Sequence, residues 1–136
     1  MLYLHIMAKY RIYSFEKLNV YKDILDLRIK IQQTISSFPN NEIYDSARQI
    51  KRATDSIGAN IAEGSGRASN LDQSHFTNMS YASALEVIYH LTIAFELGFI
   101  TQAEYESLRQ DIDKINYKLN ALYKYQRENS NSLKNK

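Results

Sequence analysis

Carboxylate and histidine side chains at helical spacing are the first residues in this sequence that suggest chemistry. Glu86 and His90 are four positions apart, the spacing that brings two side chains onto one face of a helix. Di-metal four-helix bundles use a Glu-x-x-His pair on each of two helices, plus a glutamate on each of the other two. The remaining histidines, His5 and His75, supply no matching pair. We therefore expect no metal site, and we interpret His90 as a partly buried side chain held by a hydrogen bond.

Motifs for nucleotide binding or nucleophilic catalysis have no support. The stretch Gly64–Ser69 only faintly echoes a G-x-G-x-x-G loop, since it follows a predicted helix and ends in serine. No G-x-S-x-G elbow is present, and the chain contains no cysteine. The carboxylate pairs Asp111/Asp113 and Glu104/Glu106 lie two residues apart, so their side chains do not face each other on a helix. We expect no catalytic residue, no cofactor and no enzymatic activity.

Basic residues are the remaining candidates, although the net charge of the 136-residue chain is only +2. One group lies in the second predicted helix and the loop after it. The last 23 residues form another, with six basic residues against one acid, a net charge of +5. A basic face of this kind can contact phosphates, whereas a solvated helix surface with a solubilising tail is the alternative that we favour for a monomer. The nucleic-acid-binding candidates are Arg48, Lys51, Arg52, Arg67, Lys118, Lys124 and Arg127.

Four helices must position these residues. One proline and four glycines in 136 residues favour long uninterrupted helices. Apolar residues at three- and four-residue intervals predict helices over residues 15–38, 45–63 and 71–97, and a fourth that opens at the capping box Thr101–Glu104 and reaches residue 127. Short connections make neighbouring helices antiparallel. The predicted fold class is all-α: an antiparallel up-down-up-down four-helix bundle over residues 15–127, with an N-terminal extension (1–14) and a polar flexible tail (128–136).

Several residues are expected to set the ends and the packing of these helices. Ser14 is a possible N-cap of the first helix, and either Ser69 or Asn70 caps the third. The stretch Gly64–Gly66 ends the second helix, because glycine readily adopts the left-handed conformation found after a helix. Gly58, inside that helix, would allow another helix to approach closely.

The third predicted helix is apolar around most of its circumference. Between Phe76 and Leu97, 14 of 22 residues are apolar or tyrosine. A lone bundle buries one face of each helix, so this pattern predicts an oligomer. Polar residues interrupt every apolar run, so we expect no membrane span. The start of the chain, which could be Met1 or Met7, resembles no signal peptide, and a cytoplasmic location is the default expectation.

Tyrosine is over-represented, with eleven residues against five phenylalanines. An amphipathic ring suits the edge of a bundle or a subunit interface, and we favour that role over base stacking. The tyrosines expected on or beside the apolar stripes are Tyr21, Tyr81, Tyr89, Tyr105, Tyr117 and Tyr123.

The stretch Gln49–Arg67 closely resembles the signature of a bacterial family, the four-helix-bundle proteins encoded in intervening sequences of 23S ribosomal RNA genes, also called S23 ribosomal proteins. Its most specific part reads Asn60-Ile61-Ala62-Glu63-Gly64-Ser65-Gly66-Arg67. Weaker matches extend the resemblance over about Phe15 to Leu122; they include Phe15–Lys22, Phe38-Pro39, Glu42, Tyr44, Ala84–Glu86 and Ala94–Ile100. Many relatives have proline in place of Gly58 and arginine in place of Lys51.

This resemblance implies a bundle that assembles as a ring-like homopentamer. The accessory variability proteins of diversity-generating retroelements are similar, and among them a basic pentamer binds nucleic acid and a reverse transcriptase. The resemblance therefore implies self-association, with RNA or DNA and a reverse transcriptase as further possible partners. Asn60, Glu63 and Arg67 are binding residues on one interpretation and a hydrogen-bonded helix end on the other, which we favour.

Two functional hypotheses follow. The leading one is a non-enzymatic oligomeric scaffold associated with nucleic acid, with phosphate contacts that do not read the sequence. The alternative is a protein-interaction module whose surface docks a partner such as a reverse transcriptase.

Overall fold

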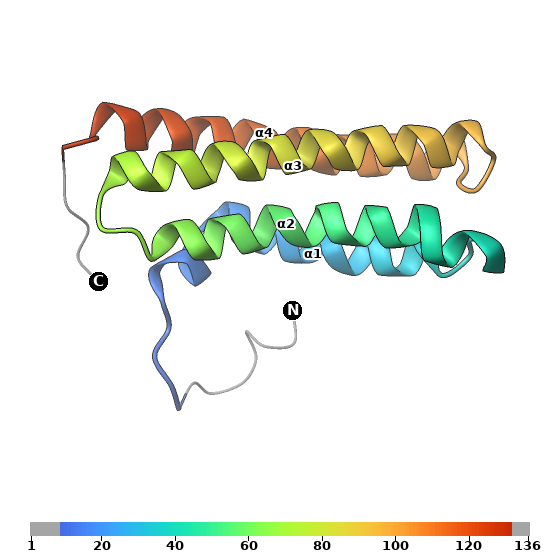
Figure 1. Cartoon of the computed structure of the whole chain (residues 1–136), viewed down its shortest axis with the longest axis horizontal. Coiled ribbons are helices and arrows are strands. Elements are labelled where there is room, and N and C mark those ends of the chain that lie inside the picture. Colours follow the sequence, from blue (N-terminus) through green and yellow to red (C-terminus); the bar gives the residue numbers. More distant parts are fainter. Residues whose placement is uncertain (1–8, 132–136) are drawn as a thin grey trace.

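The fold is an antiparallel bundle of four helices, seen in a computed structural model that describes residues 9–131, apart from the side chains of residues 42–44. The helices are α1 (Asn19–Ile35), α2 (Arg48–Ser65), α3 (Asn70–Glu96) and α4 (Gln102–Glu128). α1 and α2 form one layer and α3 and α4 the other (Figure 1), and each helix packs against both of its neighbours around the bundle. The described residues contain no strand, and the predicted all-α bundle is confirmed.

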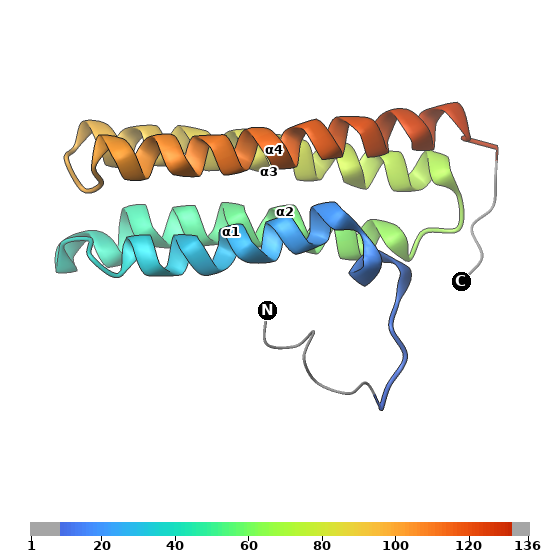
Figure 2. The ribbon, with the colours of Figure 1, turned by 180° about the vertical axis from the view of Figure 1, so that it is seen from behind.

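The two ends of the bundle are distinct. At the α2–α3 end, the loop Gly66–Ser69 lies beside the C-terminus of α4 and the start of α1, as the two opposite views show (Figures 1 and 2). At the α3–α4 end, the loop Leu97–Thr101 lies beside the N-terminus of α2. His5, both possible start methionines and the last five residues of the predicted tail lie outside the described residues.

The core follows the predicted periodicity. Branched aliphatic residues from all four helices are almost fully buried between the layers, which removes their apolar surface from water. The largest of them are Leu27, Ile31, Ile50, Ile57, Leu91, Leu108, Ile112, Ile115 and Leu119.

The start of α1 differs from the prediction. Residues Ser14–Lys17 form a separate 3₁₀ helix, η2, and Leu18 is extended (φ −73°, ψ 133°), so α1 begins at Asn19 and Ser14 is not its cap. The break lets Phe15 pack edge-to-face on Tyr21, with ring centroids 5.0 Å apart. Residues six apart point to different sides of a continuous helix, so an unbroken helix would separate these rings.

Other helix ends follow local rules. α1 ends at Ile35, four residues before Pro39, and its last turn is closed by a hydrogen bond from the Ser37 hydroxyl to the Thr34 carbonyl. A short 3₁₀ helix (η3, Asn40–Glu42) and a π-helical turn (η4, Ile43–Ala47) lead into α2. The side chain of Ser69 caps α3, and Thr101 and Glu104 form the predicted capping box of α4.

α2 ends within the predicted stretch, at Ser65 with Gly66 as its C-cap, but the expected left-handed glycine was wrong. Neither Gly64 nor Gly66 adopts the left-handed conformation: Gly64 lies within α2, Gly66 follows it at φ −79°, and Gly98 (φ 78°) is the only glycine among the described residues with positive φ. Gly64 is instead buried against α3. Gly58 does permit the predicted close approach, because a Cβ there would lie 3.3 Å from Ile24 of α1.

Candidate functional site

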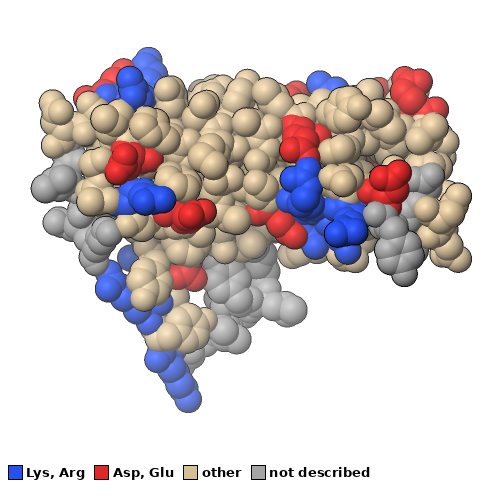
Figure 3. Space-filling model, in the orientation of Figure 1, with Lys and Arg blue, Asp and Glu red and all other residues tan. Residues whose placement is uncertain are grey.

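The seven predicted nucleic-acid-binding residues do not form one patch. Arg48, Lys51 and Arg52 lie at the start of α2, at the α3–α4 end of the bundle. Arg67 lies in the loop at the opposite end, and the other three lie in the C-terminal half of α4. Because α4 has 27 residues and is about 40 Å long, the two ends cannot contact the same few phosphates. Figure 3 shows the basic side chains of one face in separate groups, several of them beside an acid.

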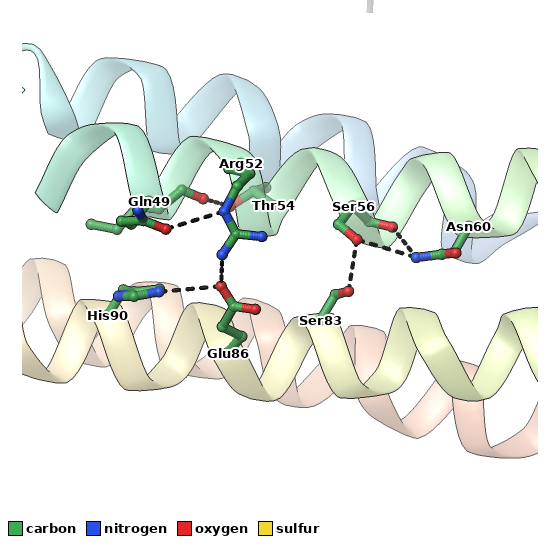
Figure 4. Close-up of polar contacts among 9 residues, drawn as sticks. Gln49, Arg52, Thr54, Ser56, Asn60, Ser83, Glu86 and His90 are labelled. Carbon is green, nitrogen blue, oxygen red and sulfur yellow. Dashed lines mark hydrogen bonds and ion pairs between the residues drawn. The ribbon is translucent and has the colours of Figure 1, made fainter. Parts of the chain in front are cut away.

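Arg52 forms an ion pair that joins α2 to α3. Its guanidinium forms an ion pair with the carboxylate of Glu86 and a hydrogen bond, 3.1 Å long, with the side chain of Gln49 (Figure 4). His90 contacts the same carboxylate oxygen at 3.2 Å, which confirms the hydrogen bond expected for this histidine. Arg52 is therefore not a free cation. No three side chains that commonly bind metals gather together among the side chains that the structure describes.

Lys118 is neutralised in a similar way between α1 and α4. Its ammonium group donates a 2.5 Å hydrogen bond to Asp23, whose side chain is only 14% exposed. Lys114 lies 3.6 Å from the other oxygen of the same carboxylate. Two turns further along α1, Lys30 pairs with Asp111 at 2.8 Å, so a line of ion pairs joins the two helices.

Arg67 packs against α3. Its guanidinium lies over the ring of Phe76, 4.6 Å from the centroid, and its carbonyl accepts a hydrogen bond from the side chain of Gln73. Arg67 makes no ion pair with Glu63, four residues earlier, although both side chains are described, so the hydrogen-bonded helix end favoured for these residues does not include that pair. A cation held on an aromatic face supports the loop and keeps its charge at the surface.

Besides Arg67, four of the seven predicted residues make no ion pair with any described side chain. Lys124 and Arg127 are exposed on the last two turns of α4, Arg48 is exposed at the start of α2, and Lys51 is half-buried. Lys124 and Arg127 lie three residues apart and are both exposed, whereas of the neighbours Arg48 and Lys51 only Arg48 is exposed. The end of α4 is therefore the place where two exposed candidates without an ion pair lie close together in the sequence.

The signature stretch holds α2 against α3. The side-chain amide of Asn60, itself buried, donates to the carbonyl (2.9 Å) and hydroxyl (3.2 Å) of Ser56, and that hydroxyl lies 2.9 Å from the hydroxyl of Ser83 on α3 (Figure 4). Ile61 is buried and Ala62 is half-buried, while Glu63 is exposed. These contacts give Asn60 a structural role, as the sequence favours, although within α2 and not at its end.

Some contacts had no signal in the sequence. The hydroxyl of Thr77 donates to the buried side chain of Gln126 at 2.7 Å, which joins α3 to α4. Ser80 bonds the carbonyl of Ile57 at 2.8 Å across α2 and α3. Polar residues inside an apolar helix were the only indication of such bonds, and they do not identify the partner.

The tyrosines occupy varied positions. Tyr105 stacks on Phe95 and bonds Thr92 through its hydroxyl, as expected at a bundle edge. Tyr117, in contrast, is 79% exposed, beside a groove of about 350 Å³ between the start of α1 and α4. The groove is lined by Leu18, Asn19, Val20, Tyr117, Lys118, Ala121 and Leu122. None of the helices described is long and apolar enough to cross a membrane.

Comparisons with known proteins agree with this architecture. The sequence model of the 23S rRNA-intervening sequence protein family matches residues 16–121. Among solved structures, a protein of unknown function from the S23 ribosomal protein family of Bacteroides thetaiotaomicron VPI-5482 is similar, with a TM-score of 0.71 and 29% identity over 77% of this chain and 95% of that one. A search of curated proteins found no match. The four-helix fold and the match over residues 16–121 show that the chain belongs to the 23S rRNA-intervening sequence protein family.

Proposed function

We propose that this chain is a non-enzymatic scaffold that associates with copies of itself through the outer face of α3. The observation that carries the proposal is an exposed apolar stripe on that helix. Leu85, Tyr89, Ile93 and Leu97 follow one another at four-residue intervals and are 45%, 60%, 38% and 57% exposed. Leu71 and Met79, earlier on α3, are exposed as well.

Such a stripe is costly for a monomer in water. Large exposed apolar patches usually mark interaction sites, and the stripe runs along much of a 27-residue helix. In Figure 3 the upper part of the face, over α3, is largely uncharged, whereas charged side chains lie along α2 and its boundary with α3. We propose that a second copy of the chain covers this stripe, because every subunit of an oligomer carries the same apolar surface. A ring-like homopentamer, as the family resemblance implies, is the assembly that we expect.

Light scattering after size-exclusion chromatography tests self-association. The wild-type protein is expected to be oligomeric at micromolar concentration, and the double variant L85E/I93E monomeric with an unchanged helical circular dichroism spectrum. Ile29→Glu is the matched control, since Ile29 is 50% exposed on α1, outside the stripe. It should leave the oligomer intact. A monomeric wild-type protein would contradict the proposal.

A second function, association with nucleic acid, is favoured by a specific observation. Lys124 and Arg127 are exposed near the C-terminus of α4 and make no ion pair within the described chain. We propose that they contact phosphates without reading the base sequence, and that self-assembly multiplies the contacts. Binding of structured RNA and DNA should weaken steeply as salt rises. No binding at low salt, or binding indifferent to salt, would contradict this function.

The alternative is a protein partner such as a reverse transcriptase. A pull-down that recovers the same single protein after nuclease treatment would favour that function over nucleic-acid association.

A further inference from the structure

We propose that the C-terminal half of α4 binds single-stranded nucleic acid by stacking unpaired bases on Tyr117 and Tyr125. The inference rests on the nucleic-acid association proposed above and names its site and the form of the ligand. It follows from the exposure of the two rings, the charges around them and the groove beside one of them.

Tyr117 and Tyr125 are exposed without a structural role in the described chain. They are 79% and 59% exposed, and within residues 9–131 neither ring packs on another ring and neither hydroxyl makes a hydrogen bond. Tyr105 of the same helix, in contrast, stacks on Phe95, and its hydroxyl contacts Thr92 and Arg109. A tyrosine that only covers the bundle edge would resemble Tyr105.

Basic residues interleave with these rings. Lys114, Tyr117, Ala121 and Lys124 recur at intervals of three, four and three residues, which places them on one face of α4. Tyr125 directly follows Lys124 in the sequence and, eight residues after Tyr117, lies about 12 Å further along the helix. Rings on such a face, beside cations, are the arrangement with which proteins bind single strands: bases stack while the cations contact the backbone.

The groove beside Tyr117 adds a place for a base. Its walls are mainly apolar, from Leu18, Val20, Ala121 and Leu122, and the side chain of Lys118, whose ammonium group bonds Asp23, also lines it. Its volume of about 350 Å³ falls within the usual range for small-molecule sites, about 300–1,000 Å³. Bases in a duplex are already stacked and paired, so a ring on a convex helix surface reaches only unpaired bases.

The charge pattern separates this face from the α3 stripe. The run Leu85, Tyr89, Ile93 and Leu97 contains no charged residue, as suits a contact with another copy. On α4, Lys114 and Lys124 share the face of the tyrosines, and burying them against a second identical basic surface would bring like charges together.

Fluorescence anisotropy with the full chain tests the inference. The probes are labelled 20-nucleotide oligo(dT) and oligo(rU), with a labelled 20-base-pair duplex beside them. The wild-type protein is expected to bind the single strands more tightly than the duplex. Each of Tyr117→Ala and Tyr125→Ala should weaken single-strand binding about fivefold or more, the size of a lost base–aromatic stack, and Tyr→Phe at either position should restore it to within about twofold.

Two further variants separate this inference from the function on which it rests. The variant K124Q/R127Q should weaken binding to single strands and duplex alike and reduce the dependence on salt. Tyr10→Ala, which removes a 52% exposed tyrosine far from α4 in sequence, should bind like the wild-type protein.

The outcomes are distinct. Equal affinity for single strands and duplex, or Tyr→Ala variants that bind like the wild-type protein, would overturn stacking while phosphate binding stands. No binding of any probe at low salt would overturn the nucleic-acid function itself. If light scattering shows that the Tyr→Ala variants change the oligomer size, the face is a contact between copies and the inference is wrong.

Discussion

Gly64 of α2 and Phe76 of α3 approach so closely that no other residue fits at position 64. A Cβ added to Gly64 would lie 2.5 Å from the Cβ and 3.2 Å from the Cγ of Phe76. Arg67 lies over the ring of the same phenylalanine. The glycine and the arginine of the signature stretch thus meet one residue of the next helix, and this contact joins α2 to α3 where the chain turns.

Gly64→Ala is expected to destabilise the fold. The new methyl group would push α2 away from α3, and overpacking of this kind costs about 1–3 kcal/mol. Urea unfolding followed by circular dichroism measures the free energy of unfolding. Gly58→Ala is the matched control in the same helix, because its Cβ would meet only the Ile24 side chain at 3.3 Å while gaining about 1 kcal/mol of helix propensity. Equal stabilities of the two variants would contradict the packing argument.

The buried hydrogen bond between Thr77 and Gln126 is expected to behave as a coupled pair. Thr77→Val leaves the side-chain amide of Gln126, which is 5% exposed, without its 2.7 Å partner, at a cost of about 1–3 kcal/mol. Replacing both residues, as in T77V/Q126M, removes the unsatisfied group and should recover part of that loss. A double-mutant cycle measures the coupling, and additive single effects would show that the bond does not join α3 to α4.

Much of this fold is predictable because it depends on local patterns. The capping box of α4 needs only Thr101 and Glu104, three residues apart, and the helix cores need only their apolar periodicity. The break at Leu18 was missed because it depends on the packing of Phe15 on Tyr21. A glycine at position 64 is typical of a helix end, but here glycine is needed because Phe76 of α3 leaves no room for a Cβ.

The candidate site was less predictable for the same reason. All seven basic residues were visible in the sequence, but their availability depends on acids that only the fold brings near. Glu86 lies 34 residues from Arg52, and Asp23 lies 95 residues from Lys118. Ion pairs between helices therefore decide which basic residues remain available to bind phosphate. The spacing of residues within one helix does not predict these pairs.

Tyr21 is expected to contribute to loss of stability in alkali. Burial, and to a lesser degree the negative charge of Glu16, raise the pKa of its hydroxyl. The folded state then holds this proton more tightly than the unfolded state does, so the stabilisation is complete below the ordinary tyrosine pKa of about 10 and is lost as pH rises above it. The free energy of unfolding of Tyr21→Phe should fall less between about pH 8 and pH 11 than that of the wild-type protein. Glu16→Gln should show a smaller change in the same direction, and an identical pH dependence in all three proteins would contradict the assignment.

Asp23→Asn is expected to strengthen nucleic-acid binding. Asp23 neutralises Lys118 at 2.5 Å and lies 3.6 Å from Lys114, so removing its charge frees both cations beside the groove of Tyr117. Each freed lysine that contacts a phosphate should add about 0.7 to the salt dependence of single-strand binding, measured as the slope of log affinity against log salt. Asp55→Asn is the control, because it removes the ion-pair partner of Arg28 between α1 and α2, and it should leave both affinity and slope unchanged. An unchanged slope for Asp23→Asn would mean that Lys114 and Lys118 serve only to join α1 to α4, and that phosphate contacts lie elsewhere.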